Sequence, residues 1–148
     1  MGDESAQTTQ PTLAVCRTVR FSAAHHLYNP AWPPEENERV FGRCSREGGH
    51  GHNYSLTLSV TGAHDRTTGM VVNVSQLQKV LEREVVEQLD RRNLNTDVPF
   101  LAGVIPTMEN LVEKLAGRLG PCLKALGVSL HRIEIAESET NRVSMEFT

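Results

Sequence analysis

Residues 44–61, CSREGGHGHNYSLTLSVT, decide the fold. Every even position from 54 to 60 is apolar, and every odd position from 55 to 61 is Ser or Thr. This period of two predicts a strand with one buried face and one wet face. Carried backwards, the same parity includes His52 and His50, so both imidazoles are expected on one face of the strand. Because Cys44 adds a thiol close by, the stretch predicts a metal site on a sheet.

The length and charge of the chain limit what it can be. Its 148 residues fit one domain with a single core, and the formal charge of −3 mixes acid and base throughout. It lacks the clustered Lys and Arg that nucleic acids or anionic membranes require. Three widely spaced cysteines and no apolar run near the N-terminus indicate a reducing compartment. We therefore expect a cytoplasmic protein.

The segments on either side of the central strand differ in character. Residues 1–12 are small and polar, which predicts a disordered tail ahead of a single domain at residues 13–148. Residues 13–25 alternate imperfectly, as a half-buried strand does, and His25 shares the parity of Phe21 and Ala23. Residues 27–49 hold three prolines and an acidic run, which predicts a long ordered loop with at most one short helical turn.

The second half of the chain predicts two helices and a closing hairpin. Ser75 and Gln78 form a capping box at the start of a helix over residues 75–89. Thr107 is the expected N-cap of a second helix, which Gly120-Pro121 should end or kink. Two alternating runs between residues 133 and 147 predict the hairpin. The order ββααββ indicates an α+β fold, a four-stranded antiparallel sheet with two helices on one face. Joining its open edges to neighbouring subunits would cover them.

The histidines predict a metal site of the catalytic kind. His50 and His52 form a two-ligand clip, and His25 is the third ligand if the first strand pairs with the second across the long loop. Three neutral imidazoles leave one tetrahedral position open, as in catalytic zinc sites. The alternative is ordinary hydrogen-bonded histidines. Cys44, flanked by Arg43 and Arg46, could be a fourth ligand, a buried small side chain or a catalytic base.

Several short motifs, in unbroken order over about residues 15–147, together resemble the 6-pyruvoyltetrahydropterin synthase family. They are Phe21-Ser22-Ala23-Ala24-His25, Phe41-Gly42-Arg43-Cys44 with five residues before His50-Gly51-His52-Asn53-Tyr54, Leu89-Asp90, Asn93-Leu94-Asn95, Asp97-Val98-Pro99, Glu109-Asn110 and Glu137. The resemblance implies a tunnelling fold (T-fold) and a homohexamer of two trimers with active sites at subunit interfaces. It also implies conversion of 7,8-dihydroneopterin triphosphate to 6-pyruvoyltetrahydropterin, with loss of triphosphate.

The resemblance further implies roles for individual residues. The Zn²⁺ ligands of the family fall on His25, His50 and His52, and its catalytic thiol falls on Cys44, with Asp90 as a partner in proton transfer. The glutamate that anchors the pterin falls on Glu137. Thr107 and Glu109 fall at positions that contact the substrate. From the residues alone, Glu137 would be an exposed carboxylate of the hairpin and Asp90 a residue of a helix-end turn.

Two positions depart from the family pattern. Arg91 stands where the family has a His after its Asp, and a guanidinium cannot exchange protons at this pH. Met108 stands where the family has a second Thr. Two alternatives therefore stay open. One is the related 6-carboxytetrahydropterin synthase of the queuosine (deazapurine) pathway, which the five residues between Cys44 and His50 disfavour. The other is a zinc-bearing pterin-binding protein with impaired or redirected catalysis.

Overall fold

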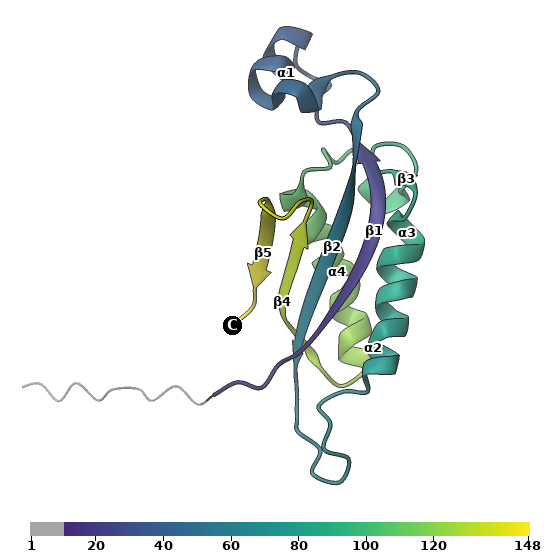
Figure 1. Ribbon diagram of the computed structural model, residues 1–148, viewed down its shortest axis with the longest axis vertical. Coiled ribbons are helices and arrows are strands. Elements are labelled where there is room, and N and C mark those ends of the chain that lie inside the picture. Colours follow the sequence, from purple (N-terminus) through teal and green to yellow (C-terminus); the bar gives the residue numbers. More distant parts are fainter. Residues whose placement is uncertain (1–10) are drawn as a thin grey trace, which may run out of the picture.

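A computed structural model describes residues 11–148 as an α+β fold built on one five-stranded sheet (Figure 1). The strand order is β3-β1-β2-β4-β5. Three pairs are antiparallel, namely β1 with β2, β2 with β4 and β4 with β5. The strand bounds are Val15–His25 for β1, His50–Thr61 for β2, Arg92–Asn93 for β3, Ser129–Ala136 for β4 and Arg142–Glu146 for β5.

The predicted four-stranded, all-antiparallel sheet is wrong at one edge. β3 is a fifth strand of two residues, and it pairs in parallel with β1. Backbone hydrogen bonds from Arg91 to Ser22 and from Leu94 to Ala24 attach it, with N···O distances of 2.6 and 2.8 Å. A strand of two residues is too short to show a hydrophobic period, so the sequence pattern could not reveal it. The predicted closing hairpin is confirmed as β4 and β5.

The helices follow the predicted order with corrected ends. They are α1 (Pro34–Phe41), α2 (Val74–Leu81), α3 (Glu87–Leu89) and α4 (Met108–Ala125), with a π-helical turn at Glu82–Val86 between α2 and α3. The predicted helix over residues 75–89 is thus α2, the π turn and α3. Its cap is Asn73, whose side chain accepts a hydrogen bond from the Ser75 N–H, so the predicted capping box is wrong.

The predictions for α4 were right at its start and wrong near its end. The Thr107 side chain accepts a hydrogen bond from the Asn110 N–H, which confirms the N-cap. Pro121 lies inside the helix, which continues to Ala125, so the expected end at Gly120-Pro121 is wrong, while the alternative of a kink stays a prediction. Gly120 precedes it and has no Cβ to clash with the proline ring. Buried Leu119 and Leu123 on either side hold this part of the helix against the core.

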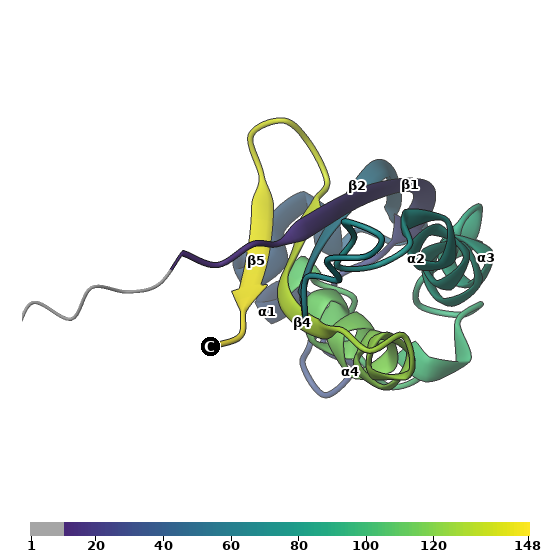
Figure 2. The same ribbon diagram turned by 90° about the horizontal axis from the view of Figure 1, so that it is seen from below.

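The sheet has one covered face and one bare face. Figure 2 shows α2, α3 and α4 on the same side of the sheet, as predicted. The even positions of β2 from Tyr54 to Val60 point into the core, together with Ile133 and Ile135 of β4. The opposite face is polar, with Thr18 and Thr57 joined by a 2.9 Å contact between their hydroxyls. No helix of residues 11–148 has both the length and the apolar character needed to cross a membrane.

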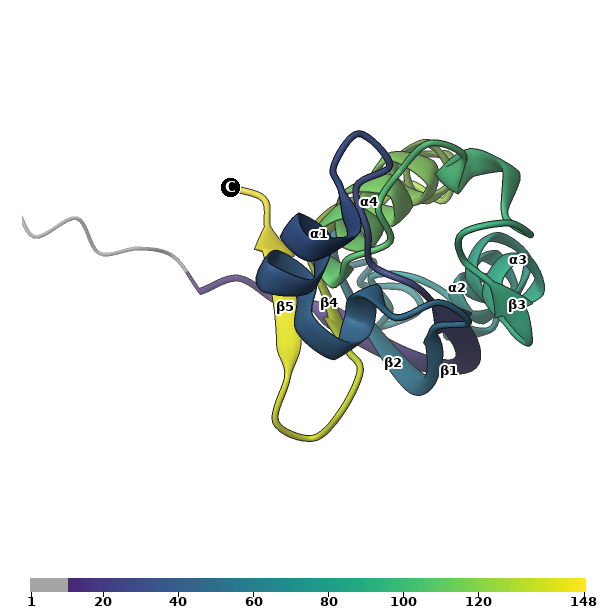
Figure 3. The same ribbon diagram turned by 90° about the horizontal axis from the view of Figure 1, so that it is seen from above.

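The predicted loop between β1 and β2 carries α1 and extends beyond the end of the sheet (Figures 1 and 3). Its two ends are held together where they leave the strands. The Leu27 N–H donates to the Cys44 carbonyl over 2.8 Å. Gly49, at φ +64°, lies so close to β1 that a Cβ on it would sit 2.3 Å from the His25 carbonyl oxygen. Glycine is therefore required where the loop returns to the sheet. The predicted tail lies almost wholly outside the described residues.

Candidate metal centre

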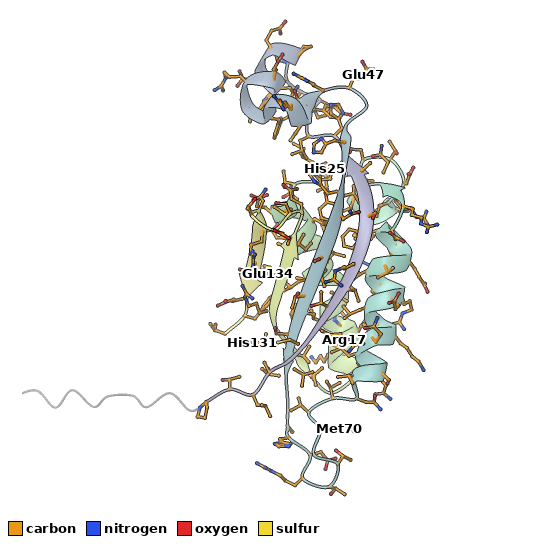
Figure 4. The ribbon with its side chains drawn as sticks, viewed as in Figure 1. Arg17, His25, Glu47, Met70, His131 and Glu134 are labelled. Carbon is orange, nitrogen blue, oxygen red and sulfur yellow. The ribbon has the colours of Figure 1, made fainter. Side chains whose placement is uncertain are left out.

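Three histidines meet where β1 ends and β2 begins. The antiparallel register places His25 opposite His50 and Ala23 opposite His52. One ligand nitrogen from each of the three histidines lies within 4.8 Å of the others, and the Nε2 atoms of His25 and His50 are 3.1 Å apart. Figure 4 shows His25 at the end of β1, below the loop. The structure therefore brings together the three residues that the parity argument selected, and metal binding by them stays a prediction.

His25 is oriented by groups behind it. Only 3% of the residue is exposed, and its Nδ1 lies 3.0 Å from the Pro106 carbonyl oxygen. A carbonyl can only accept, so this contact places the proton on Nδ1 and leaves Nε2 free to bind a metal. The Tyr54 hydroxyl lies 3.3 Å from the same Nδ1. Pro106 and Tyr54 thus hold the ring in the orientation that a ligand requires.

The surroundings of His25 and His52 favour the neutral form of both rings. Burial lowers the pKa of His25, and the nearby His50 and His52 lower it further, although the hydrogen bond to Pro106 acts in the opposite direction. Burial also lowers the pKa of His52, while the charge of Glu137 opposes this shift. Neutral imidazole is the form that binds a metal ion. Zinc commonly binds three imidazole nitrogens, and here one of the three rings is oriented by a hydrogen bond to the Pro106 carbonyl. The residues present therefore suit that ion.

Cys44 lies beside this cluster but is not one of its three members. It sits in the short 3-10 helical segment Gly42–Ser45, at the end of the loop, and is half-buried. Its Sγ is 3.9 Å from the Nε2 of His50. The thiol is thus close to the histidines, on an element separate from the strands that carry them.

Glu137 also reaches the cluster. It follows β4 directly, and one carboxylate oxygen lies 3.6 Å from the Nε2 of His52. The other carboxylate oxygen accepts a hydrogen bond from the Asn141 side chain over 2.5 Å. Only 18% of the Glu137 side chain is exposed, so it is not a free hairpin carboxylate. Burial raises the pKa of Tyr54, and the charges of Glu137 and Cys44 raise it further, which keeps this hydroxyl protonated.

Three other predicted residues lie outside this group. One Asp90 oxygen accepts from the Ser22 N–H at 2.8 Å, Thr107 caps α4, and Glu109 is exposed in the first turn of α4. Within residues 11–148, no hydrogen bond or ion pair connects any of the three to the histidines. Their roles at the site therefore stay predictions.

Arg91 has an unusual backbone. Its φ of 60° is the one positive value at a non-glycine position in the described part of the chain. The side chain is 91% exposed, and its Nε lies 4.0 Å from an Asp90 oxygen. It lines a cavity of about 440 Å³ together with Gly51, His52 and Asn53. Those three residues also border a second cavity, of about 770 Å³, which extends past Glu137 to Arg142.

Sequence reasoning missed two groups that complete the site. Tyr54 has the parity of His50 and His52, and that parity was the signal that could have placed its hydroxyl near them. The Pro106 carbonyl could not have been found, because a backbone oxygen leaves no pattern of side chains. Arg91 was singled out because it replaces a His of the family, but nothing in the sequence indicated its left-handed backbone conformation.

Comparisons with known proteins agree on one family. A family model described as 6-pyruvoyl tetrahydropterin synthase matches residues 14–147. The chain is 40% identical over 129 residues to the 6-pyruvoyl tetrahydrobiopterin synthase of Homo sapiens, covering 87% of this chain and 88% of that protein. The protein of that name from Dictyostelium discoideum is 38% identical over 132 residues, covering 89% and 94% of the two chains. The solved 6-pyruvoyl tetrahydropterin synthase of Caenorhabditis elegans superposes with a TM-score of 0.84 at 30% identity, covering 93% and 97%.

Proposed function

The chain belongs to the 6-pyruvoyl tetrahydropterin synthase family, and on that premise we propose that it is a zinc-dependent lyase. The proposed reaction converts 7,8-dihydroneopterin triphosphate to 6-pyruvoyltetrahydropterin and eliminates triphosphate. The observation that carries this proposal is the meeting of the three histidines with Cys44 on one side and Glu137 on the other.

His25, His50 and His52 would hold the zinc ion. Bound zinc would supply a Lewis acid that polarises the hydroxyl groups of the substrate side chain. The Pro106 carbonyl orients the His25 ring through Nδ1, which would leave Nε2 available to the ion. The lowered pKa values of His25 and His52 keep both rings in the binding form.

Cys44 would move protons. Its Sγ lies 3.9 Å from the Nε2 of His50, so a substrate held at the histidines would lie within reach of the thiol, which would act as general base in its deprotonated form. Asp90 is a second proposed member of the proton path. Its carboxylate is oriented by the Ser22 N–H.

Glu137 would select the pterin. Its carboxylate can accept hydrogen bonds from the amino group and the ring N–H of the substrate, a pairing that substrates without this edge cannot make. Asn141 fixes one of its oxygens. Thr107 and Glu109, at the start of α4, are proposed to contact the substrate as well.

An assembly of six subunits, two trimers with active sites at the interfaces, is also proposed. The outer strands β3 and β5 present edges that a neighbouring subunit can cover. Asp90 and Glu109 have no contact with the histidines of their own subunit in the described chain, which suits a site shared between subunits. We also propose that the protein is located in the cytoplasm.

Arg91 favours a second candidate function, a zinc-bearing pterin-binding protein with impaired or redirected catalysis. Incubating zinc-loaded protein with 7,8-dihydroneopterin triphosphate, then identifying the pterin by mass spectrometry and the phosphate by phosphorus NMR, separates the candidates. The proposal expects 6-pyruvoyltetrahydropterin and free triphosphate. A 6-carboxy product would replace it with the 6-carboxytetrahydropterin synthase alternative, and tight pterin binding without turnover would support the second candidate.

A further inference from the structure

We propose that His26 and Asn95 are positioning residues that set the place of the Cys44 thiol relative to the histidine cluster. This inference rests on the proposed function, in which Cys44 moves protons. In the described chain, no hydrogen bond joins the side chain of either residue to the three clustered histidines. They act on the backbone of the segment that carries the thiol.

The side chain of His26 bonds the residue after Cys44. Its Nε2 lies 2.5 Å from the Ser45 carbonyl oxygen. Because a carbonyl only accepts, Nε2 must carry the proton and donate it. The next residue, Leu27, donates its N–H to the Cys44 carbonyl over 2.8 Å. Two consecutive carbonyls of the thiol segment are thus bonded by two consecutive residues that follow β1.

Asn95 holds His26 for this task. Its Oδ1 accepts from the His26 N–H, and its Nδ2 donates to the His26 carbonyl, both over 2.8 Å. One amide therefore satisfies both backbone groups of His26, which an ionised carboxylate cannot do because it has no donor. The Asn95 N–H in turn donates to the side chain of Asn93, the last residue of β3, over 2.9 Å, so Asn95 is itself anchored to the sheet.

The His26 ring is held on a second side. It stacks on Tyr28, with ring centroids 4.3 Å apart and an interplanar angle of 28°. The backbone clamp and the stack together leave the ring little freedom, so the position of its Nε2 is well defined. A donor fixed in this way can define where an acceptor on a loop comes to rest.

The position of the Cys44 thiol depends on these backbone hydrogen bonds, because the Cys44 side chain itself makes few contacts. Among residues 11–148, its one hydrogen-bond contact is the 3.9 Å approach to His50. The position of Sγ is therefore set by the backbone of residues 44 and 45. A displacement of about 1 Å in a reacting group can cost roughly 100-fold in rate.

The test compares His26→Phe, His26→Gln and Asn95→Leu with the wild type, all loaded with zinc. Phe keeps a ring that can stack on Tyr28 and removes the donor, whereas Gln supplies an N–H donor without the ring. Thr96→Ala, at an exposed neighbour of Asn95, is the matched control. Four quantities are measured: zinc content, Tm, the steady-state kcat and KM, and the rate of Cys44 alkylation by iodoacetamide. Peptide mass spectrometry follows the alkylation, with exposed Cys16 as the internal reference.

We expect His26→Phe and Asn95→Leu to keep full zinc content while kcat falls about 10- to 100-fold and KM changes less than about threefold. Alkylation of Cys44 should quicken several-fold relative to Cys16, because the loop opens more often. His26→Gln should recover much of the lost kcat, which a merely structural role would not produce.

Unchanged kcat and unchanged Cys44 alkylation in His26→Phe would overturn the inference, as would a His26→Gln variant no better than His26→Phe. Loss of zinc from either His26 variant would also overturn it, because His26 would then support His25 and not the thiol. If the wild-type protein shows no turnover, the proposed function fails. The alkylation rates still decide the positioning role independently.

Discussion

The Nε2 of His52 and a carboxylate oxygen of Glu137 lie 3.6 Å apart, one at the start of β2 and the other just beyond the end of β4. The proposed metal ligand and the proposed pterin anchor thus occupy one corner of the sheet. A substrate held by Glu137 would therefore lie next to the three histidines.

Replacing Glu137 with Gln should weaken substrate binding while leaving zinc in place. A hydrogen bond to a charged group contributes about 1.5–3 kcal/mol, so KM should rise roughly tenfold to hundredfold. Steady-state kinetics and zinc analysis measure both effects. Glu139→Gln, at an exposed position in the same turn, is the control and should behave as wild type. Equal KM values for the two variants would remove Glu137 from the substrate site.

Cys44→Ala and His50→Ala should separate catalysis from metal binding. The Cys44 variant should keep its zinc and lose about 10²- to 10⁴-fold in kcat, the usual contribution of a general base. The His50 variant should lose zinc and activity together. Metal analysis after dialysis, combined with the product assay, distinguishes them. If Cys44→Ala loses its metal, the thiol is a fourth ligand and the site is structural.

Arg91→His should raise kcat by about tenfold or more, because an imidazole beside Asp90 can exchange a proton near neutral pH and a guanidinium cannot. The left-handed conformation tolerates His better than most side chains, so the turn should persist. Arg91→Lys keeps the charge and is the control, with no gain expected. A rate for Arg91→His at or below that of the wild type would mean that the proton path here avoids this position.

The corrected cap of α2 gives a stability test. Asn73→Ala removes the side chain that accepts from the Ser75 N–H and should lower the free energy of unfolding by about 1 kcal/mol. Ser75→Ala removes the residue that the sequence pattern favoured and should change it by less than about 0.5 kcal/mol. Urea denaturation of both variants compares them. The reverse order of the two effects would restore Ser75 as the cap.

Glu84 should make stability depend on pH. Hydrogen bonding to Arg83 lowers the pKa of Glu84 below its ordinary value of 4.5, with Arg118 acting in the same direction. A lowered folded-state pKa stabilises the protein above pH 4.5, and this contribution is lost as the pH falls through the folded-state value. Glu84→Gln should therefore unfold about 1 kcal/mol more easily at pH 7, a difference that vanishes in acid. Glu87→Gln is the exposed control. A difference that persists in acid would exclude the ionised pair as its cause.

The centre of the fold could be predicted because its signal was periodic. The parity of residues 50–60 determined which side of β2 faces the core, and pairing across the loop placed His25 opposite His50. The N-cap at Thr107 also followed from local chemistry. These features depend on neighbours within a few residues or on one strand pair, which a sequence pattern records directly.

The remainder depended on contacts that no pattern records. β3 exists because the backbone N–H groups of Arg91 and Leu94 donate hydrogen bonds to carbonyls of β1. Asn73 and Ser75 are both good capping residues, and the hydrogen bond chosen depends on how the chain enters α2. The Asn95 clamp on His26 joins residues from distant segments, and each of them looks ordinary in the sequence. Long-range hydrogen bonds therefore explain the missed strand and the missed pairing of Asn95 with His26, whereas the α2 cap was a choice between two local alternatives.

The proposed metal ligands lie on paired strands and the thiol lies on the loop between them, so different parts of the backbone set their positions. The ladder of backbone hydrogen bonds sets the spacing of His25 and His50, whereas the path of residues 28–43 leads to the thiol that lies beside them. Insertions or deletions in that segment would leave the imidazoles where they are. A change in the loop would thus move Cys44 relative to three imidazoles whose own positions are set by the sheet.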